Sequence, residues 1–101
     1  MGIELEATKH AERRIRRRIG ISKSAIPKLL LEVGNEGYSS KNYSGRFQRY
    51  LKSIKHNQGV ADYALIHNNF IYFCRGNFVI TVYNVRPEYR AIKPKERRNE
   101  T

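Results

Sequence analysis

Residues 63–85 read YALIHNNFIYFCRGNFVITVYNV, and the expected fold class rests on this stretch. It holds three short runs rich in β-branched and aromatic residues, namely 63–67, 70–75 and 78–85. The runs are separated by Asn68-Asn69 and Gly76-Asn77, and both pairs tolerate the backbone of tight hairpin turns. The pattern therefore predicts three antiparallel strands. Because apolar side chains fall on both faces, we expect helices to cover one face and a ligand or partner to meet the other.

The residues before this stretch favour helices. An apolar stripe recurs at every fourth position, at Ala11, Ile15 and Ile19. Thr8 suits the N-cap of this first helix, and Gly20 suits the left-handed position at its end.

A second helix is expected to start at Ser22 or Ser24, since Pro27 is tolerated only in a first turn. Gly34-Asn35 would end it, and residues 35–45 consist of turn formers that predict a loop.

A third helix is expected from Ser44 to about His56, because Phe47, Tyr50, Leu51 and Ile54 form an amphipathic pattern. A strand over residues 3–7 would add an edge to the sheet. Together these elements predict an α+β fold in which N-terminal helices pack on a three- to four-stranded antiparallel sheet. We expect one domain over residues 1–93 and a basic, flexible tail over residues 94–101.

The charge balance favours a polyanionic partner. The 101 residues include 20 Lys and Arg against 9 Asp and Glu, a formal net charge of +11. Residues 9–18 hold six basic side chains, and residues 37–61 hold five basic and no acidic side chains. Such an excess is typical of a nucleic-acid-binding domain, because each Lys or Arg that neutralises a phosphate releases counterions. A charged surface that only interacts with water is the alternative.

Other classes of protein are excluded by the composition. The single cysteine, Cys74, allows neither a disulfide framework nor a multi-thiolate zinc site within one chain, and we expect a buried, inert thiol. Because no apolar run approaches ~20 residues, we expect no membrane span. Since no segment pairs a basic face with a strong Trp/Leu/Phe face, we also expect no membrane partner. The first residues lack the apolar region of a secretory signal. We therefore expect action in the cytoplasm, including that of a target cell into which the protein is delivered.

One polar stripe of the first helix suits phosphodiester chemistry. It consists of His10, Arg14, Arg17 and Arg18, at helical spacing and beside the apolar stripe. An imidazole can move protons near neutral pH, and guanidinium groups can hold a phosphate and stabilise a pentacoordinate state. Because RNA supplies its own 2′-OH as nucleophile, this chemistry needs no metal and no other cofactor. A solvated helix face is the alternative.

Two motifs carry a resemblance. HAERRIRRR at 10–18 resembles the HAxxRxxxR opening of small bacterial RNase-toxin-like proteins of the barnase–EndoU–colicin–RelE-like group, of the BrnT-like kind. VITVY at 79–83 resembles the apolar-Thr-Val-Tyr strand that ends their sheet. The resemblance implies N-terminal helices followed by an antiparallel sheet, and metal-independent RNA cleavage. It also implies a cognate antitoxin or immunity protein as a partner.

The resemblance further implies roles for single residues. His10 would be the general acid or base, and Arg14 and Arg18 would bind and stabilise the phosphate. Thr81 and Tyr83 would position the phosphate or take part in proton transfer.

More candidates lie outside the two motifs. His67, at a strand end, is either a second acid or base or a polar residue beside a turn. Further RNA-binding candidates on the first helix, on the third helix and after the last strand are Arg17, Arg46, Arg49, Lys52, Lys55 and Arg86. Tyr72, Phe73 and Tyr83 could stack on bases, with a place in the core as the alternative.

The leading hypothesis is a metal-independent ribonuclease of toxin type that cleaves tRNA or mRNA through 2′-OH transesterification. Two alternatives remain open. One is a non-catalytic nucleic-acid-binding module that uses the same basic face. The other is a bacterial or phage regulator that binds an acidic protein.

Overall fold

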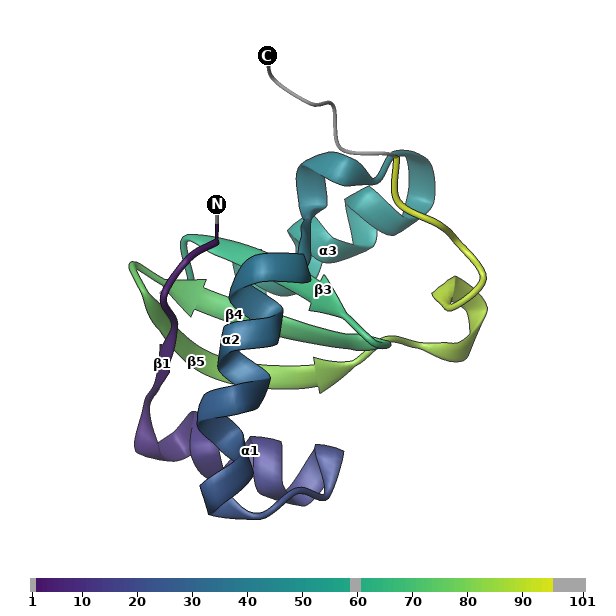
Figure 1. The fold of residues 1–101 in the computed structure, drawn as a ribbon. Helices are drawn as coiled ribbons and strands as arrows, with labels where there is room; N and C mark the ends of the chain where they lie inside the picture. The colour runs from purple at the N-terminus through teal and green to yellow at the C-terminus, as the bar shows by residue number, and fades with distance from the viewer. Residues whose placement is uncertain (1, 59–60, 96–101) are drawn as a thin grey trace.

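Three helices pack on a five-stranded mixed sheet, which is an α+β fold (Figure 1). The structure is a computed structural model that describes residues 2–58 and 61–95. The strand order across the sheet is β1 (Glu6–Ala7), β5 (Phe78–Asn84), β4 (Phe70–Arg75), β3 (Tyr63–His67) and β2 (Tyr38–Ser39). The three expected strands are present as β3, β4 and β5, and each pairs antiparallel with the next.

The turn chemistry explains the two hairpins. Asn68 and Asn69 take φ values of 47° and 67°, and Gly76 takes 58°. All three lie in the left-handed region that tight hairpin turns require. The hairpin prediction is therefore confirmed in both position and mechanism.

The prediction of a three- to four-stranded antiparallel sheet is wrong in two respects. The N-terminal segment does add an edge, but β1 runs parallel to β5, so the sheet is mixed. The expected loop over 35–45 contains β2, which pairs antiparallel with β3, and a short 3-10 helix, η2 (Ser40–Asn42). Both short strands satisfy the unpaired backbone of an edge strand, a tertiary effect that local turn propensity does not reveal.

The first two helices follow the sequence closely. Helix α1 (Lys9–Ile19) is capped by Thr8, whose hydroxyl accepts a hydrogen bond from Ala11 N at 3.1 Å. Gly20 ends it with φ 82°. A 3-10 turn, η1 (Lys23–Ala25), precedes α2 (Ile26–Glu36), and Pro27 lies in the first turn of α2.

Gly34 does not end α2, contrary to expectation, because it serves a close contact instead. Ile3 N donates to Gly34 O at 3.0 Å, and a Cβ on Gly34 would lie 1.9 Å from Ile3 O. The glycine thus lets the N-terminal segment pass directly against the helix.

Helices cover both faces of the sheet. Figure 1 shows α2 crossing in front of the sheet, with α1 beside β5. Both helices pack on one core, to which Ile15 and Val33 contribute fully buried side chains. Helix α3 (Gly45–Gln58) packs on the other core through Phe47 and Leu51. The expectation that one face stays free for a ligand is therefore wrong for the part of the sheet under α3.

Three strand residues are removed from solvent. Tyr72 and Phe73 are 1% and 0% exposed, so the core alternative holds for them and base stacking does not. Cys74 is 0% exposed, and burial raises the pKa of its thiol to about 12, with the nearby Tyr63 opposing the shift. The expected buried thiol is confirmed.

The end of the described chain is tied to the domain. Lys95 N donates to Asn42 O at 2.6 Å, so Pro94 and Lys95 do not begin a free tail. The rest of the expected tail, 96–101, lies outside the described residues. Among the residues that are described, no helix is both long and apolar enough to cross a bilayer.

Candidate functional site

Helix α1 runs alongside β5 in the same direction. Near its start, Thr8 N donates to Val79 O at 3.1 Å, and near its end Arg18 Nη1 donates to Asn84 Oδ1 at 3.5 Å. Between these contacts the helix advances about 15 Å and the strand about 17 Å, so the two elements stay in step. Because Thr8 is joined to Val79, His10 lies beside the next residue of β5, Ile80, along the direction of the strand.

The side chains of α1 reach around an open sheet edge. Strand β1 pairs only with Phe78 and Val79, so within the described chain no strand covers the following residues of β5. The side chains of Ala11 and Ile15, both 0% exposed, define the face of α1 that packs on the core. The stripe that carries the arginines lies beside this face and therefore projects past the open edge of β5.

A β-bulge determines which strand residues meet that stripe. Phe73 pairs with Thr81 while Cys74 pairs with Val79, so one residue of β5 is left unpaired between them. Without this shift Val79 and Thr81 would share a face. With it, Thr81 and Tyr83 lie on the face that α3 partly covers.

Two guanidinium groups flank one phenol ring. The Cζ atoms of Arg14 and Arg18 lie 5.8 and 5.5 Å from the centroid of the half-buried Tyr83 ring. Arg14 Nε donates to His10 Nε2 at 3.4 Å, which leaves the imidazole as a hydrogen-bond acceptor at that nitrogen. These contacts bring together four of the six predicted catalytic residues, and Thr81 lies two residues before Tyr83 on the same face of β5. We call these five residues the α1–β5 cluster: His10, Arg14, Arg18, Thr81 and Tyr83.

Thr81 holds an unexplained polar atom. The residue is 4% exposed, and its Oγ1 has no hydrogen-bond partner in the described part of the chain. A buried hydroxyl without a partner destabilises a fold by about 1–3 kcal/mol. Such an atom needs an explanation beyond packing, and a position under a binding site is one.

The cluster carries positive charge without a carboxylate partner. Within residues 2–58 and 61–95, neither Arg14 nor Arg18 forms a salt bridge. Planar guanidinium groups held over a ring keep their N–H edges available for a phosphate. An anion that binds there would contact Arg14, Arg18 and the neighbouring imidazole.

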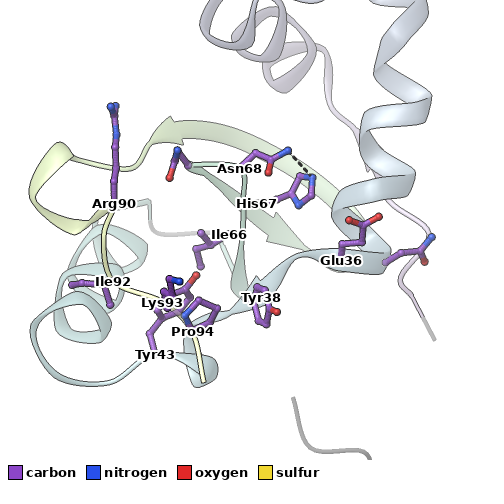
Figure 2. Close-up of a pocket in the computed structure, with 12 residues that line it drawn as sticks. Glu36, Tyr38, Tyr43, Ile66, His67, Asn68, Arg90, Ile92, Lys93 and Pro94 are labelled. Atoms are coloured by element: carbon purple, nitrogen blue, oxygen red, sulfur yellow. Dashed lines mark hydrogen bonds between the residues drawn. The ribbon is translucent and has the colours of Figure 1, made fainter. Parts of the chain in front are cut away.

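His67 does not join this cluster. It lies on β3, two strands and about 10 Å from β5 across the sheet. Its Nε2 is 4.0 Å from Glu32 Oε2 of α2. The same nitrogen is 3.3 Å from the amide Nδ2 of Asn68 (Figure 2). It therefore faces α2, on the opposite side of the sheet from Tyr83. This geometry favours the alternative of a polar residue beside a turn.

A hollow of about 640 Å³ lies beside His67, between β3 and residues 90–94 (Figure 2). Tyr38, Tyr43 and Ile66 line it. The side chain of Arg90 extends away from the other lining residues, and its Nε donates to Val85 O at 3.0 Å. The His67 imidazole is directed at Asn68 and the Arg90 side chain extends away, so these two groups do not converge there.

Two of the predicted RNA-binding arginines meet at a second place. Tyr50 of α3 stacks on Tyr89 of η3 (Pro87–Tyr89), with ring centroids 4.7 Å apart. The Cζ of Arg86 lies 5.7 Å from the Tyr50 centroid, and that of Arg46 lies 5.6 Å from the Tyr89 centroid. Sequence reasoning found the arginines but missed the rings. Helical spacing places Tyr50 on the apolar face of its helix, and Tyr89 carries no periodic signal.

The remaining candidates stay separate. Arg17, Arg49 and Lys52 are exposed on helix surfaces, as expected of either RNA contacts or a solvated face. Lys55 is half-buried and donates to Asp62 O at 3.1 Å, so it ties α3 to the segment before β3.

No protein-family model, curated protein or solved structure matches this chain. In the described part of the chain, His, Cys, Asp and Glu side chains do not gather in groups of three or more as a metal site would require.

Proposed function

We propose that the protein is a metal-independent ribonuclease of toxin type whose reaction takes place at the α1–β5 cluster. One observation carries the proposal. Arg14 and Arg18 flank Tyr83, and His10 contacts Arg14, so an acid/base group adjoins two phosphate ligands. The resemblance of residues 10–18 and 79–83 to the opening and closing motifs of RNase toxins supports the same assignment.

The proposed chemistry follows from these groups. Arg14 and Arg18 hold the scissile phosphate and stabilise the charge of the phosphorane. When Arg14 turns its Nε–H from His10 to the phosphate, the freed His10 Nε2 takes the proton of the 2′-OH, and the O2′ attacks phosphorus as the bond to the 5′-oxygen breaks. The leaving 5′-oxygen takes a proton from the Tyr83 phenol. The products are a 2′,3′-cyclic phosphate and a 5′-hydroxyl end.

The test is incubation of purified protein with tRNA and with mRNA in EDTA. His10→Ala should abolish cleavage while binding persists. Arg16→Ala is the matched control, because it removes one exposed charge from the same helix outside the cluster. Discrete fragments with cyclic phosphate ends, lost only in His10→Ala, are the expected result. Intact RNA after incubation with the unaltered protein would overturn the proposal.

A second candidate is a nucleic-acid-binding module without catalysis. The placement of Arg46 and Arg86 on stacked tyrosines favours it, because these contacts offer cations to a phosphate and include no acid/base group. In that case the same RNA would be retarded on a gel but not cut. If cleavage is found, we expect a cognate antitoxin or immunity protein that covers the basic stripe of α1.

A further inference from the structure

A cluster of two arginines and two tyrosines lies beyond the proposed catalytic groups. We call it the tyrosine platform: Arg46, Tyr50, Arg86 and Tyr89. Its rings are anchored from below, since the Tyr89 centroid lies 5.1 Å from that of Phe47, a core residue that is 1% exposed. The rings are half-buried, whereas both arginines are exposed.

The arginines do little for the fold. Exposed cation–π contacts and exposed ion pairs contribute weakly to stability. Arg46 forms no salt bridge within the described chain, and Arg86 pairs with Glu88 at 3.0 Å, where both side chains are about half exposed. A phosphate can compete with that carboxylate because the pair is solvated. What the rings provide is orientation: each guanidinium is held flat with its N–H edge outward.

The tyrosine platform adjoins the α1–β5 cluster. Tyr50, Tyr83 and Tyr89 all pack against the same core. Burial raises the pKa of the Tyr50 phenol, the Arg86 guanidinium opposes the shift, and the phenol of Tyr83 is among the groups that raise it further. Tyr83 therefore lies within electrostatic reach of Tyr50. Arginines stacked on tyrosines therefore occur on α1 and β5 and again on α3 and η3, around the same core.

Cations stacked on aromatic rings suit an unpaired polynucleotide. Guanidinium groups hold phosphates, and guanidinium planes supported by rings accept the faces of bases that a duplex keeps stacked internally. An acidic protein surface would use the charges but would not need the rings.

We propose that the tyrosine platform is a second nucleotide subsite, which binds the single-stranded RNA next to the phosphodiester held by the α1–β5 cluster. Arg46 and Arg86 bind phosphates or offer the outer faces of their guanidinium planes to an unpaired base, and Tyr50 and Tyr89 hold those planes in place. The identity of the strand as a substrate rests on the proposed function, but the binding itself does not.

The experiment separates binding from cleavage. A fluorescent 2′-O-methyl oligonucleotide lacks the 2′-OH nucleophile, so its anisotropy reports binding alone. The test variant is Arg46→Ala combined with Arg86→Ala. The matched control is Lys41→Ala combined with Arg75→Ala, which removes two exposed charges elsewhere. Thermal unfolding establishes that each variant is folded.

We expect the platform variant to bind roughly 5- to 30-fold more weakly than the control variant. The slope of log K against log salt should fall by about 2, one unit for each phosphate that the variant no longer binds. A duplex of the same sequence should bind more weakly than the single strand to the unaltered protein. Equal affinity of the two variants, or equal binding of duplex and single strand, would overturn the inference.

The two proposals fail differently. Loss of affinity in the platform variant, with no cleavage of ordinary RNA by the unaltered protein, would retain the subsite and remove the ribonuclease. Cleavage that depends on His10, with unchanged affinity in the platform variant, would do the reverse.

Discussion

Replacing Thr81 by Val tests whether the candidate site keeps a buried hydroxyl that the fold does not use. The two side chains have nearly the same shape, and both suit a strand. The substitution therefore removes little more than the Oγ1 atom, which is buried and has no partner in the described chain. Relief of that desolvation should raise the free energy of unfolding by about 1–2 kcal/mol. For a domain of this size, each kcal/mol shifts Tm by about 4–8 °C.

The assay is urea unfolding together with a thermal scan. Thr81→Ser is the control, since it keeps the hydroxyl and loses a buried methyl group, and it should be less stable than the unaltered protein by about 1 kcal/mol. An unchanged m-value would show that the variants unfold between comparable states. If Thr81→Val is instead less stable, the hydroxyl has a partner in solution and the reasoning is refuted. If the hydroxyl also serves the reaction, the more stable variant should cleave RNA more slowly.

Three further predictions follow from the geometry. Arg14→Lys should lower the cleavage rate by about 10²-fold, since an ammonium lacks the planar fork of a guanidinium, whereas Arg16→Lys should leave the rate unchanged. Gly34→Ala should destabilise the fold by about 1–3 kcal/mol in urea unfolding, because the new Cβ meets the backbone oxygen of Ile3. This cost should exceed the gain from the better helix propensity of Ala. A neutral result would mean that the N-terminal segment does not pack there. The Cys74 thiol has a pKa raised from 9.0 to about 12 in the fold, so its contribution to stability is complete below pH 9 and is lost as the pH rises from 9 toward 12. Unfolding curves measured from about pH 7 to 11 should show that decline, and Cys74→Ala should lessen it.

The local features of the fold could be predicted from the sequence. The Asn68-Asn69 and Gly76-Asn77 turns, the Thr8 cap and the Gly20 stop each depend on the backbone preferences of one or two residues. The strand β2 and the parallel direction of β1 could not be predicted from the sequence. Both strands pair with backbone groups that β3 and β5 would otherwise leave without partners, and this depends on the tertiary arrangement. The role of Gly34 is hidden for the same reason. Its lack of a side chain makes room for the backbone of Ile3, which is far away in the sequence.

The candidate site was predictable to a similar extent. Helical spacing placed His10, Arg14 and Arg18 on one stripe without any structure. Their meeting with Tyr83 depends on the length of β1 and on the bulge in β5, neither of which has a local signal. His67 was also a candidate from the sequence, but it does not join the site. The alternation of side chains along β3 places it on the α2 side of the sheet, opposite Tyr83.

The pairing of the two ends of the domain has a consequence for folding. The hairpins of β3, β4 and β5 join neighbours in sequence, whereas Glu6 pairs with Phe78 and Arg18 contacts an asparagine 66 residues later. Contacts of such long range close large loops and form late relative to local hairpins. During synthesis, helix α1 emerges before β5 and has no strand to dock on until β5 has left the ribosome. We therefore expect a nascent chain that lacks β5 not to cleave RNA, even where its basic residues bind it.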